Sequence, residues 1–497
     1  MKFSLPLTLF LLLVTCLAHA AENRQTTPTL EPLVRTVDLN LGQSATLILC
    51  DGKEATVKLL ALKEKRDDLR GAVREARVTV EVNGEKAEFV SATYHLPTDV
   101  GGVQIDCPVT KGHVQDKSNP WSLDADARLR LWPAGSPWIR PGTLHYPVPQ
   151  RWFASQTLMA NQIADGDPPG KKFIYYHWGL DFGGAEDLVE VQAATDGVVV
   201  SARGKVLEPG KYPPLVKPRY DVVYIRDARG WFYRYSHLNV IDKTIQVGTK
   251  VKMGQKLGLL GKEGASGGWT HLHFSIVRPQ PSGRAGEDDA YAFVWQAYRE
   301  QYSPKLIANA RPHLVSWTNK PVTLDGTRSW SVLGPDAIKK YEWTLSNGKT
   351  AQGPKTTVIY NRAGTYNEIL KVTDNKGRAD YDFAVVRVSD PNNPNDHRPG
   401  IHAAYWPTFD IKPGQPITFK VRASYVKSDE GKETWDFGDG SPKVTTQSDG
   451  NQDPHNKNGY AITTYTYKKP GHYLVSVSRT NSRGETATDR LEVRVGE

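Results

Sequence analysis

The chain has 497 residues, 39% of them hydrophobic, and its 63 Lys and Arg residues against 54 Asp and Glu residues give a net charge of +9. A length of this order predicts several folding units, at about 150 residues for each. The basic excess is modest and is not gathered into long basic runs. The sequence therefore lacks the signature of a nucleic-acid-binding protein.

An export signal is predicted at residues 1–20. Lys2 supplies a positive charge, residues 5–17 form a short leucine-rich apolar run, and residues 18–20 (Ala-His-Ala) fit the small-x-small pattern of signal peptidase sites. The mature chain then begins at Ala21. Because no later stretch is long and apolar enough to cross a bilayer, we expect an exported protein, periplasmic or extracellular, with no membrane span.

The sequence contains 3 Cys residues. Cys16 lies in the predicted signal and is lost with it, whereas Cys50 and Cys107 remain in the mature chain. An even pair in an oxidising compartment predicts a disulfide. Two buried thiols are the alternative interpretation.

Most segments of the mature chain alternate apolar and polar residues between Gly- and Pro-containing turns. This period-two pattern predicts half-buried strands, and the clearest candidate for an amphipathic helix is residues 288–302. The predicted fold is therefore mainly β and multi-domain. The predicted domains are an N-terminal β-rich domain at 21–138, a second domain at 140–308, and two C-terminal domains at 309–390 and 398–497, which a Pro- and Asn-rich linker separates.

The two C-terminal domains are similar to one another, which indicates a repeat. Each has a Trp before a turn, Trp343 in the first and Trp435 in the second. Residues 435–440, Trp-Asp-Phe-Gly-Asp-Gly, resemble the most specific motif of the polycystic-kidney-disease (PKD) domain, while residues 343–348 of the first copy depart from it. The resemblance implies two Ig-like β-sandwiches that act as spacers or binding modules outside the cell, without catalysis.

A possible half of a metal site lies in the second domain, at His271 and His273. The alternating segment that starts at His271 predicts a strand, and residues two apart on a strand point to the same face. Two imidazoles then project side by side. Taken alone, the pair suits an ordinary polar strand face equally well.

His177 and Asp181 are the candidates for the other half. They are four residues apart, but Gly179 and the Gly pair at 183–184 argue against a helix, so we expect an irregular loop. With 13 His in the chain, the motif is weak by itself. Together with the His pair it gives two His and one carboxylate, a ligand set of catalytic zinc with an open position for water. Zinc lowers the pKa of bound water to about 7, and His237 and the non-ligating His remain for proton transfer and oxyanion stabilisation.

The second domain resembles the lysostaphin/LytM-type zinc metallopeptidases over most of its length. The matching segments, in chain order, are 177–181 (His-x-Gly-x-Asp), 191–199 (Val-Gln-Ala-Ala-Thr-Asp-Gly-Val-Val), 235–238 (Tyr-Ser-His-Leu), 247–258 (Val-Gly-x-Lys-Val-Lys-x-Gly-Gln-x-Leu-Gly) and 271–274 (His-Leu-His-Phe). The resemblance implies an antiparallel sheet around a shallow groove, with His177, Asp181 and His273 as zinc ligands. It also implies His271 and His237 as catalytic residues in the endopeptidase hydrolysis of peptides in bacterial peptidoglycan.

Two departures from the family pattern flank the His pair. The family often has Gly before the pair and Glu after its Phe, where this chain has Thr270 and Ser275. Neither position is a ligand, so the departures concern the shape of the groove and the support of the ligands.

Several other features have two interpretations each. The proline-rich segment 206–220 either lines the groove or is an inert surface loop, and Trp178 and Trp269 either wall the cleft or pack in the interior. The N-terminal domain either binds the wall or covers the groove, and we hypothesise partial latency of the second kind. The remaining mature histidines are expected to be structural or surface residues without partners, among them His95, His145, His313, His402 and His472.

The sequence is compatible with three functions. The first is an exported zinc endopeptidase acting on peptidoglycan or another extracellular peptide. The second is a noncatalytic scaffold of the same fold that binds the cell wall or regulates a wall hydrolase. The third is an adhesin whose sandwiches do most of the work. All five expected ligands and catalytic histidines are present, which favours the first.

Overall fold

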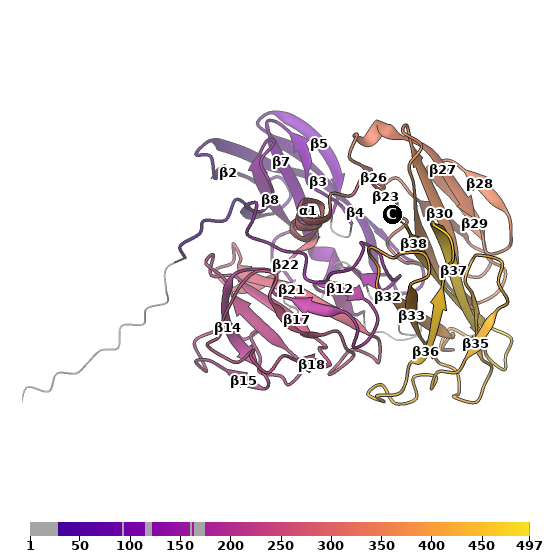
Figure 1. Cartoon of the computed structure of the whole chain (residues 1–497). Helices are drawn as coiled ribbons and strands as arrows, with labels where there is room; N and C mark the ends of the chain where they lie inside the picture. The colour runs from indigo at the N-terminus through magenta and orange to yellow at the C-terminus, as the bar shows by residue number, and fades with distance from the viewer. Residues whose placement is uncertain (1–27, 92–93, 115–121, 160–161, 164–173, 497) are drawn as a thin grey trace, which may run out of the picture.

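The computed structural model of the protein describes residues 28–91, 94–114, 122–159, 162–163 and 174–496. This part of the chain consists of many antiparallel strands and one α-helix, α1 (Tyr291–Tyr302) (Figure 1). The prediction of a mainly β, multi-domain protein is confirmed. The predicted export signal lies outside the described residues, and no helix within them is long and apolar enough to cross a membrane.

Two four-stranded sheets form the N-terminal domain, and apolar side chains of both are buried in one shared core. The first sheet contains, in spatial order, β1 (Arg35–Leu39), β8 (Ala127–Pro133), β7 (Val103–Thr110) and β6 (Thr98–Val100). The second contains β2 (Ser44–Ile48), β3 (Glu54–Arg66), β4 (Val73–Val82) and β5 (Glu85–Val90). A short 3-10 helix, η1 (Lys111–His113), follows β7.

The predicted disulfide is wrong, since Cys50 and Cys107 are both free thiols. Cys107 lies in β7 and is buried in the core between the two sheets. Cys50 lies in the turn between β2 and β3, at the partly exposed end of the other sheet. Cysteine number and compartment cannot show that two residues occupy such different places in a domain.

A nine-stranded antiparallel sheet is the framework of the second domain. Its strands, along the main path, are β15 (Lys205–Val206), β14 (Gly197–Ala202), β16 (Val223–Arg226), β17 (Phe232–Ser236), β21 (His271–Pro279), β12 (Leu180–Gly183) and β9 (Leu158–Met159). β19 (Lys250–Val251) pairs with β14, and β22 (Ala285–Asp288) pairs with β21. Two smaller sheets accompany it, β13 (Glu190–Gln192) with β20 (Lys256–Leu259) and β18 (Val240–Ile241), and β10 (Gln162–Ile163) with β11 (Tyr176–His177).

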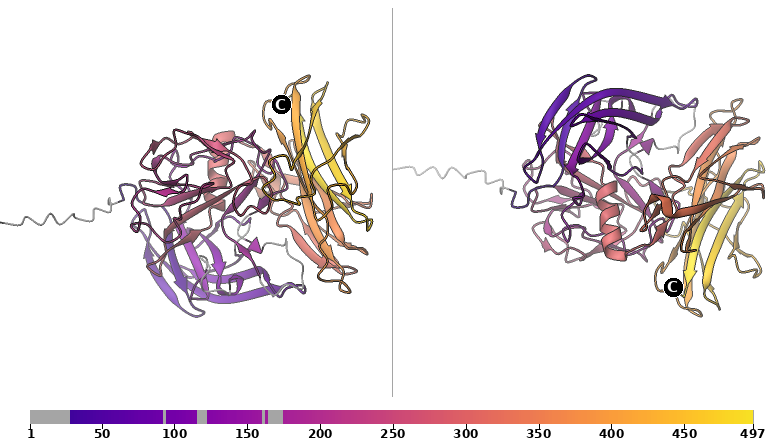
Figure 2. Two further views of the ribbon diagram at one scale, coloured as in Figure 1. Left: turned by 90° about the horizontal axis from the view of Figure 1, so that it is seen from below. Right: turned by 90° about the horizontal axis from the view of Figure 1, so that it is seen from above.

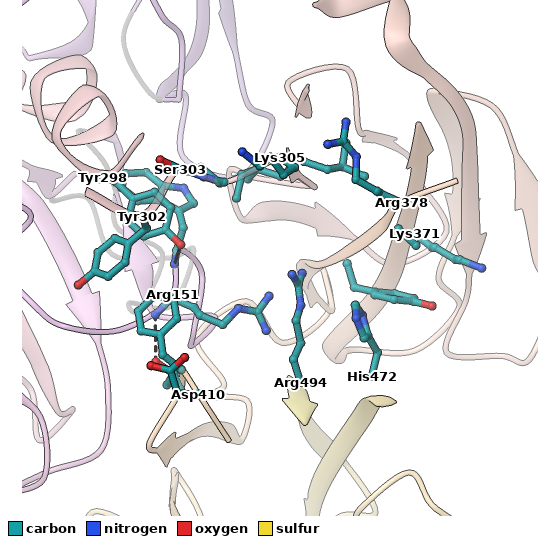
Figure 3. Close-up of a pocket in the computed structure, with 18 of the residues that line it drawn as sticks. Arg151, Tyr298, Tyr302, Ser303, Lys305, Lys371, Arg378, Asp410, His472 and Arg494 are labelled. Carbon is teal, nitrogen blue, oxygen red and sulfur yellow. Dashed lines mark hydrogen bonds between the residues drawn. The ribbon is translucent and has the colours of Figure 1, made fainter. Parts of the chain in front are cut away.

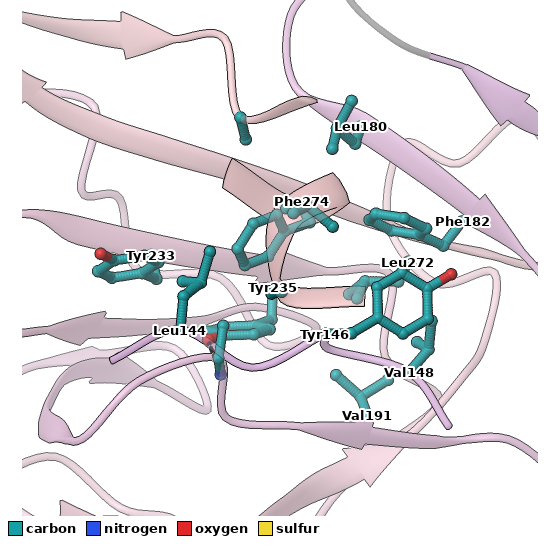
Figure 4. Close-up of a cluster of buried hydrophobic side chains, with 14 of the residues drawn as sticks. Leu144, Tyr146, Val148, Leu180, Phe182, Val191, Tyr233, Tyr235, Leu272 and Phe274 are labelled. Atoms are coloured by element: carbon teal, nitrogen blue, oxygen red, sulfur yellow. Dashed lines mark hydrogen bonds between the residues drawn. The ribbon is translucent and has the colours of Figure 1, made fainter. Parts of the chain in front are cut away.

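One face of this sheet is the core of the domain. On β12 and β21, Phe182 pairs with Leu272 and Leu180 pairs with Phe274, and all four side chains are fully or almost fully buried. Figure 4 shows them beside further apolar residues of the same cluster, such as Tyr235 of β17. Because side chains alternate along a strand, the residues between them point to the opposite face.

Helix α1 starts later than the sequence predicted. Asp288, the predicted first residue, ends β22 and pairs with Ile276, and the carboxylate of Asp289 accepts a 2.8 Å hydrogen bond from the backbone N–H of Tyr291. The predicted end at Tyr302 is confirmed. Strand pairing with β21 therefore overrides the helical spacing of the first residues.

The C-terminal part consists of two sandwiches, the first at residues 306–389 and the second at 400–495, each with its own core. Trp343 and Trp435 are completely buried in these cores, as the repeat predicts. Strands of both sandwiches share one nine-stranded sheet, which Figure 2 shows lying beside the other domains. Its strands are β24 (Leu314–Trp317), β31 (Ala379–Ser389), β30 (Gly364–Asp374), β38 (Thr486–Val495), β37 (Gly471–Thr480), β34 (Glu433–Asp436) and β35 (Val444–Thr446), with β27 (Ile338–Thr344) and β28 (Thr350–Gln352) beside β30.

The remaining strands complete the two sandwiches. They are β25 (Pro321–Asp325) with β29 (Lys355–Ile359), β23 (Leu306–Ile307) with β26 (Trp330–Ser331), and β32 (Gly400–Trp406) with β33 (Pro416–Ser424) and β36 (Ala461–Thr466); a 3-10 helix, η2 (Pro335–Ala337), precedes β27.

A cavity of about 780 Å³ lies where the end of α1 meets the two sandwiches (Figure 3). Arg151 and Arg494 line it, and both pair with the buried carboxylate of Glu492, at 2.8 Å and 3.1 Å. Asp380 pairs with the same two guanidinium groups. These carboxylates compensate the positive charges of Arg151 and Arg494 at the junction of the domains, and none of the predicted ligand residues lines the cavity.

Candidate metal centre

Three predicted ligands, His177, Asp181 and His273, converge on one point of the second domain. His177 Nε2 lies 3.0 Å from Asp181 Oδ1 and 3.1 Å from His273 Nδ1, and His273 Nδ1 lies 3.0 Å from Asp181 Oδ1. Among the described residues this is the group of His, Cys, Asp and Glu side chains whose atoms come close enough to hold a metal ion. All three side chains are buried.

Strand pairing explains the convergence. Asp181 of β12 lies directly opposite His273 of β21, and both project from the face that is opposite to the apolar core. Directly opposed side chains on antiparallel strands have Cβ atoms about 4.5–5.5 Å apart, so the carboxylate and the imidazole meet. His177 ends the short strand β11, and Gly179, at φ +87°, turns the chain so that β12 follows. The prediction of an irregular loop is thus wrong in detail, because both ligands lie on short strands around a glycine turn.

These three side chains fit a zinc ion. Donor atoms at about 2.0–2.1 Å from a tetrahedral centre are about 3.3 Å apart, close to the separations of 3.0–3.1 Å seen here. Two imidazole nitrogens and one carboxylate oxygen are also the donor set of a catalytic zinc site. The three side chains could therefore supply three of the four ligands of a zinc ion.

His271 and His237 lie next to this group. The ring centroids of His237 and His271 are 4.8 Å apart, and those of His237 and His273 are 6.1 Å apart. His271 Nε2 is 3.5 Å from Asp181 Oδ2. The five side chains singled out in the sequence are thus brought together in one cluster.

Backbone carbonyls orient both additional histidines. His271 Nδ1 donates to the carbonyl of Trp269 at 3.0 Å, and His237 Nδ1 donates to the carbonyl of Glu263 at 2.6 Å. With Nδ1 held as a donor, Nε2 is the ring nitrogen through which each histidine can exchange a proton. Both carbonyls belong to residues 261–270, the loop between β20 and β21, which we call the 261–270 loop.

Two of the three candidate ligands, Asp181 and His273, have pKa shifts that favour the forms that bind a metal. Burial alone would raise the pKa of Asp181, but the neighbouring His177 and His271 hold it well below its usual value. Burial lowers the pKa of His271 to about 4 and that of His273 well below its usual value, against the opposing effect of Asp181. A carboxylate and neutral imidazoles are the forms that bind a metal.

Sequence reasoning missed the carboxylate that supports His237. Asp221 accepts a 3.2 Å hydrogen bond from the backbone N–H of His237 and lies 3.5 Å from its Nδ1. This backbone is held at φ +69°, a left-handed conformation that needs such support. Tyr220, the last residue of the proline-rich segment, bonds Glu263 and the N–H of Gly264. One end of that segment therefore contacts the 261–270 loop, which no periodicity could indicate.

Ser275, which stands where the family often has Glu, has a carboxyl group from another strand near it. Glu287 of β22 pairs with Val277 of β21, two residues from Ser275 on the same face of that strand, and burial raises the pKa of Glu287 to about 7. A buried carboxyl group thus lies beside the position where the family often has Glu, although it comes from another strand.

The centre is enclosed by its neighbours. Exposed fractions of the five site residues range from 3% to 6%. On one side, Val109, Val114 and Leu123 of the N-terminal domain form an apolar cluster with Tyr176, and the ring of His113 packs edge-on against Tyr176 at 5.9 Å. Trp178 packs against this cluster and also lies edge-on to His273 at 6.4 Å, so it both walls the centre and packs in the interior.

Comparison with known proteins gives family matches for the second domain and both sandwiches. Residues 175–285 match the sequence model of Peptidase family M23, and residues 306–386 and 403–495 match the PKD domain. The Peptidoglycan DD-endopeptidase ShyA of Vibrio cholerae is 26% identical over 257 residues, which cover 50% of this chain and 51% of that protein. The Pre-pro-metalloprotease PrtV of Vibrio cholerae is 36% identical over 73 residues, 14% of this chain and 8% of that protein.

Among solved structures, the PKD1 domain of the same Vibrio cholerae metalloprotease is 28% identical and covers 17% of this chain and 99% of that chain, with a TM-score of 0.14. The matches span about half or less of the length of these curated relatives. The chain contains a Peptidase M23 domain of the LytM type followed by two PKD domains.

Proposed function

We propose that the protein is an exported zinc metalloendopeptidase that hydrolyses peptide bonds in peptidoglycan cross-links. The observation that carries this proposal is the meeting of His177 Nε2, Asp181 Oδ1 and His273 Nδ1 within 3.0–3.1 Å of one another inside the segment that matches Peptidase family M23. The match supports a peptidase, and the donor set supports zinc as its metal.

Each site residue has a role in this proposal. His177, Asp181 and His273 hold the zinc ion, which when bound supplies Lewis acidity and an activated water at neutral pH. His271, through Nε2, takes the proton of the attacking water and orients that water beside Asp181. His237 donates an Nε2–H to the carbonyl oxygen of the peptide, where negative charge develops, and this role requires its imidazolium form because Nδ1 already donates to the carbonyl of Glu263.

Two observations support peptidoglycan as the substrate. The relative that covers half of this chain carries the name of a peptidoglycan endopeptidase. The chain itself has a net charge of +9, which favours a polyanionic surface such as a bacterial wall. PKD domains, which this chain shares with a metalloprotease of Vibrio cholerae, support an extracellular or periplasmic location.

Zinc content and peptidoglycan release, measured on the wild type and on His271→Ala, test this function. We expect about one zinc per chain in both proteins and release of peptides by the wild type alone, because His271 is not a ligand. Zinc binding without hydrolysis by the wild type, even after release of the N-terminal domain, would favour the noncatalytic scaffold. A wild type without zinc would contradict the metal site itself.

Partial latency is part of the proposal. The site residues are nearly inaccessible, and the apolar cluster around Tyr176 joins the N-terminal domain to the strand that carries His177. A peptide chain needs access to the ligands before it can be cleaved. Displacement of the N-terminal domain is therefore expected to precede hydrolysis.

A further inference from the structure

The second PKD sandwich contacts the 261–270 loop through directed hydrogen bonds to its backbone. Arg422 of β33 donates to the carbonyl of Gly268 at 2.9 Å, and Asn451 donates to the carbonyl of Gly267 at 2.9 Å. The hydroxyl of Tyr460 accepts from the backbone N–H of Thr270 at 2.9 Å. Three contacts of this kind within four residues fix the position of the loop and not only its presence at the interface.

His402 of β32 links these contacts to the interior. Its Nδ1 lies 2.8 Å from the hydroxyl of Tyr460, and its Nε2 lies 3.2 Å from the hydroxyl of Ser155 in the segment that precedes β9. The ring packs edge-on against Trp269 at 5.9 Å. His402 is 1% exposed, and burial lowers its pKa to about 3, so the ring is a neutral hydrogen-bonding group. The prediction that His402 has no partner is wrong.

The sandwich holds these groups firmly. Arg422 is completely buried, and Asp449 accepts hydrogen bonds from its Nε and Nη2 at 2.8 Å and 2.6 Å. The guanidinium group also lies over the ring of Tyr460 at 5.8 Å. Because Arg422 is fixed on two sides within the sandwich, its contact with the loop has a defined geometry.

The loop contains a stretch of backbone that glycine adopts more readily than other residues, and contacts from outside help to fix it. Gly267 and Gly268 both have positive φ, at +70° and +82°, where glycine is the least restricted residue. A Cβ atom on Gly268 would lie 2.1 Å from the side-chain oxygen of Asn451, so the sandwich approaches the backbone as closely as glycine allows. The next two residues supply the carbonyl that orients His271 and the N–H that Tyr460 holds.

We infer that the second PKD sandwich is a positioning element of the active centre, which holds the 261–270 loop so that the carbonyl of Trp269 orients His271. The effect of the sandwich on hydrolysis rests on the proposed function, whereas its contacts with the 261–270 loop are independent of that function. Tyr460 and Asn451 act through the loop and touch neither metal ligand nor substrate. PKD domains are otherwise expected to be spacers or wall-binding modules, so this is a second role for the same fold.

The test compares Tyr460→Phe with Tyr467→Phe in the full chain. Both variants lose one buried hydroxyl of the same sandwich, but Tyr467 bonds the carbonyl of Phe437 inside it. For Tyr460→Phe we expect faster hydrogen–deuterium exchange of residues 262–270, unchanged zinc content, and a kcat on a cross-linked muropeptide about tenfold lower with little change in KM. Tyr467→Phe is expected to keep wild-type exchange in the loop and wild-type kcat.

Asn451→Ala is a second variant that leaves the sandwich core intact, and a smaller increase in loop exchange is expected from it. Wild-type exchange of residues 262–270 in both Tyr460→Phe and Asn451→Ala would overturn the inference, as would equal increases in Tyr460→Phe and Tyr467→Phe. If the wild type cleaves nothing even after release of the N-terminal domain, the proposed function fails, while the exchange measurement on the full chain still decides whether the second PKD sandwich holds the loop.

Discussion

The metal centre has two neighbours that contact it in different ways. The N-terminal domain packs apolar side chains such as Val114 against Tyr176, whereas the second PKD sandwich binds the backbone of the 261–270 loop by hydrogen bonds from Arg422 and Asn451. Apolar contacts are non-directional and can be broken as a unit, while hydrogen bonds to backbone groups fix positions. The N-terminal domain is suited to cover the metal centre, and the second PKD sandwich is suited to fix the positions of residues around it.

The proposed roles of both neighbours depend on a metal ion held at the centre, and Asp181→Asn removes one of its proposed ligands. The amide removes the negative charge of the ligand set, so we expect loss of the bound zinc and hydrolysis reduced by more than about a thousandfold. Metal analysis and peptidoglycan release measure both effects. Asp196→Asn, an exposed carboxylate in the same domain, is the control, and equal loss in both variants would contradict the assignment.

His237→Ala separates the proposed stabilisation of the carbonyl oxygen from metal binding. His237 contacts the centre beside His271 but is not a ligand, so we expect full zinc content and a kcat about a hundredfold lower. His145→Ala is the matched control, because His145 bonds Gln192 in the same domain. Loss of zinc from His237→Ala would instead assign it to the ligand set.

Val114→Asp tests the covering neighbour. A carboxylate placed in the apolar cluster with Tyr176 weakens the contact between the N-terminal domain and the β11 strand. We expect a severalfold faster hydrolysis of a soluble cross-linked muropeptide. Leu41→Asp, in which an exposed residue of the same domain is changed, leaves the rate unchanged. A slower or unchanged rate for Val114→Asp, with the fold retained, would argue against latency.

Glu287→Gln tests a buried carboxyl group outside the set of candidate metal ligands, and its effect is on stability. Burial raises the pKa of Glu287 to about 7, above the value of about 4.5 for an unfolded Glu. Between these values the folded chain keeps a proton that the unfolded chain has lost, so wild-type stability falls as pH rises from about 4.5 to about 7.

Glu287→Gln lacks this ionisation, so its free energy of unfolding relative to wild type rises over the same pH window, by at most about 3 kcal/mol. Chemical denaturation at several pH values measures the difference, with Glu190→Gln at the domain surface as the control. A difference that is independent of pH would mean that Glu287 does not titrate there.

Most residues of the candidate metal centre could be predicted from the sequence, because they lie in recognisable local patterns. Alternation along residues 271–277 predicts a strand, and the strand places His271 and His273 on one face. The pairing of Asp181 with His273 could not be predicted, since register depends on how distant strands meet. Residue types alone suggested that the two halves form one zinc ligand set, and the family resemblance then assigned His273, and not His271, as the ligand.

Contacts between domains were the part that the sequence could not provide. His402 lies 129 residues after His273 in the chain, and no motif surrounds it. Its ring nevertheless packs against Trp269. The free state of Cys50 and Cys107 depends likewise on where two sheets place them. Residue type and spacing describe local structure well, but they do not determine which surfaces of separate domains meet.

The most direct test of the account is anomalous diffraction at the zinc edge from crystals of the full mature chain. The account predicts one strong anomalous peak within bonding distance of His177 Nε2, Asp181 Oδ1 and His273 Nδ1, with Gly268 and Thr270 still bound to the second PKD sandwich. A zinc peak bound by other side chains, or no peak at these three atoms in zinc-saturated crystals, would contradict it.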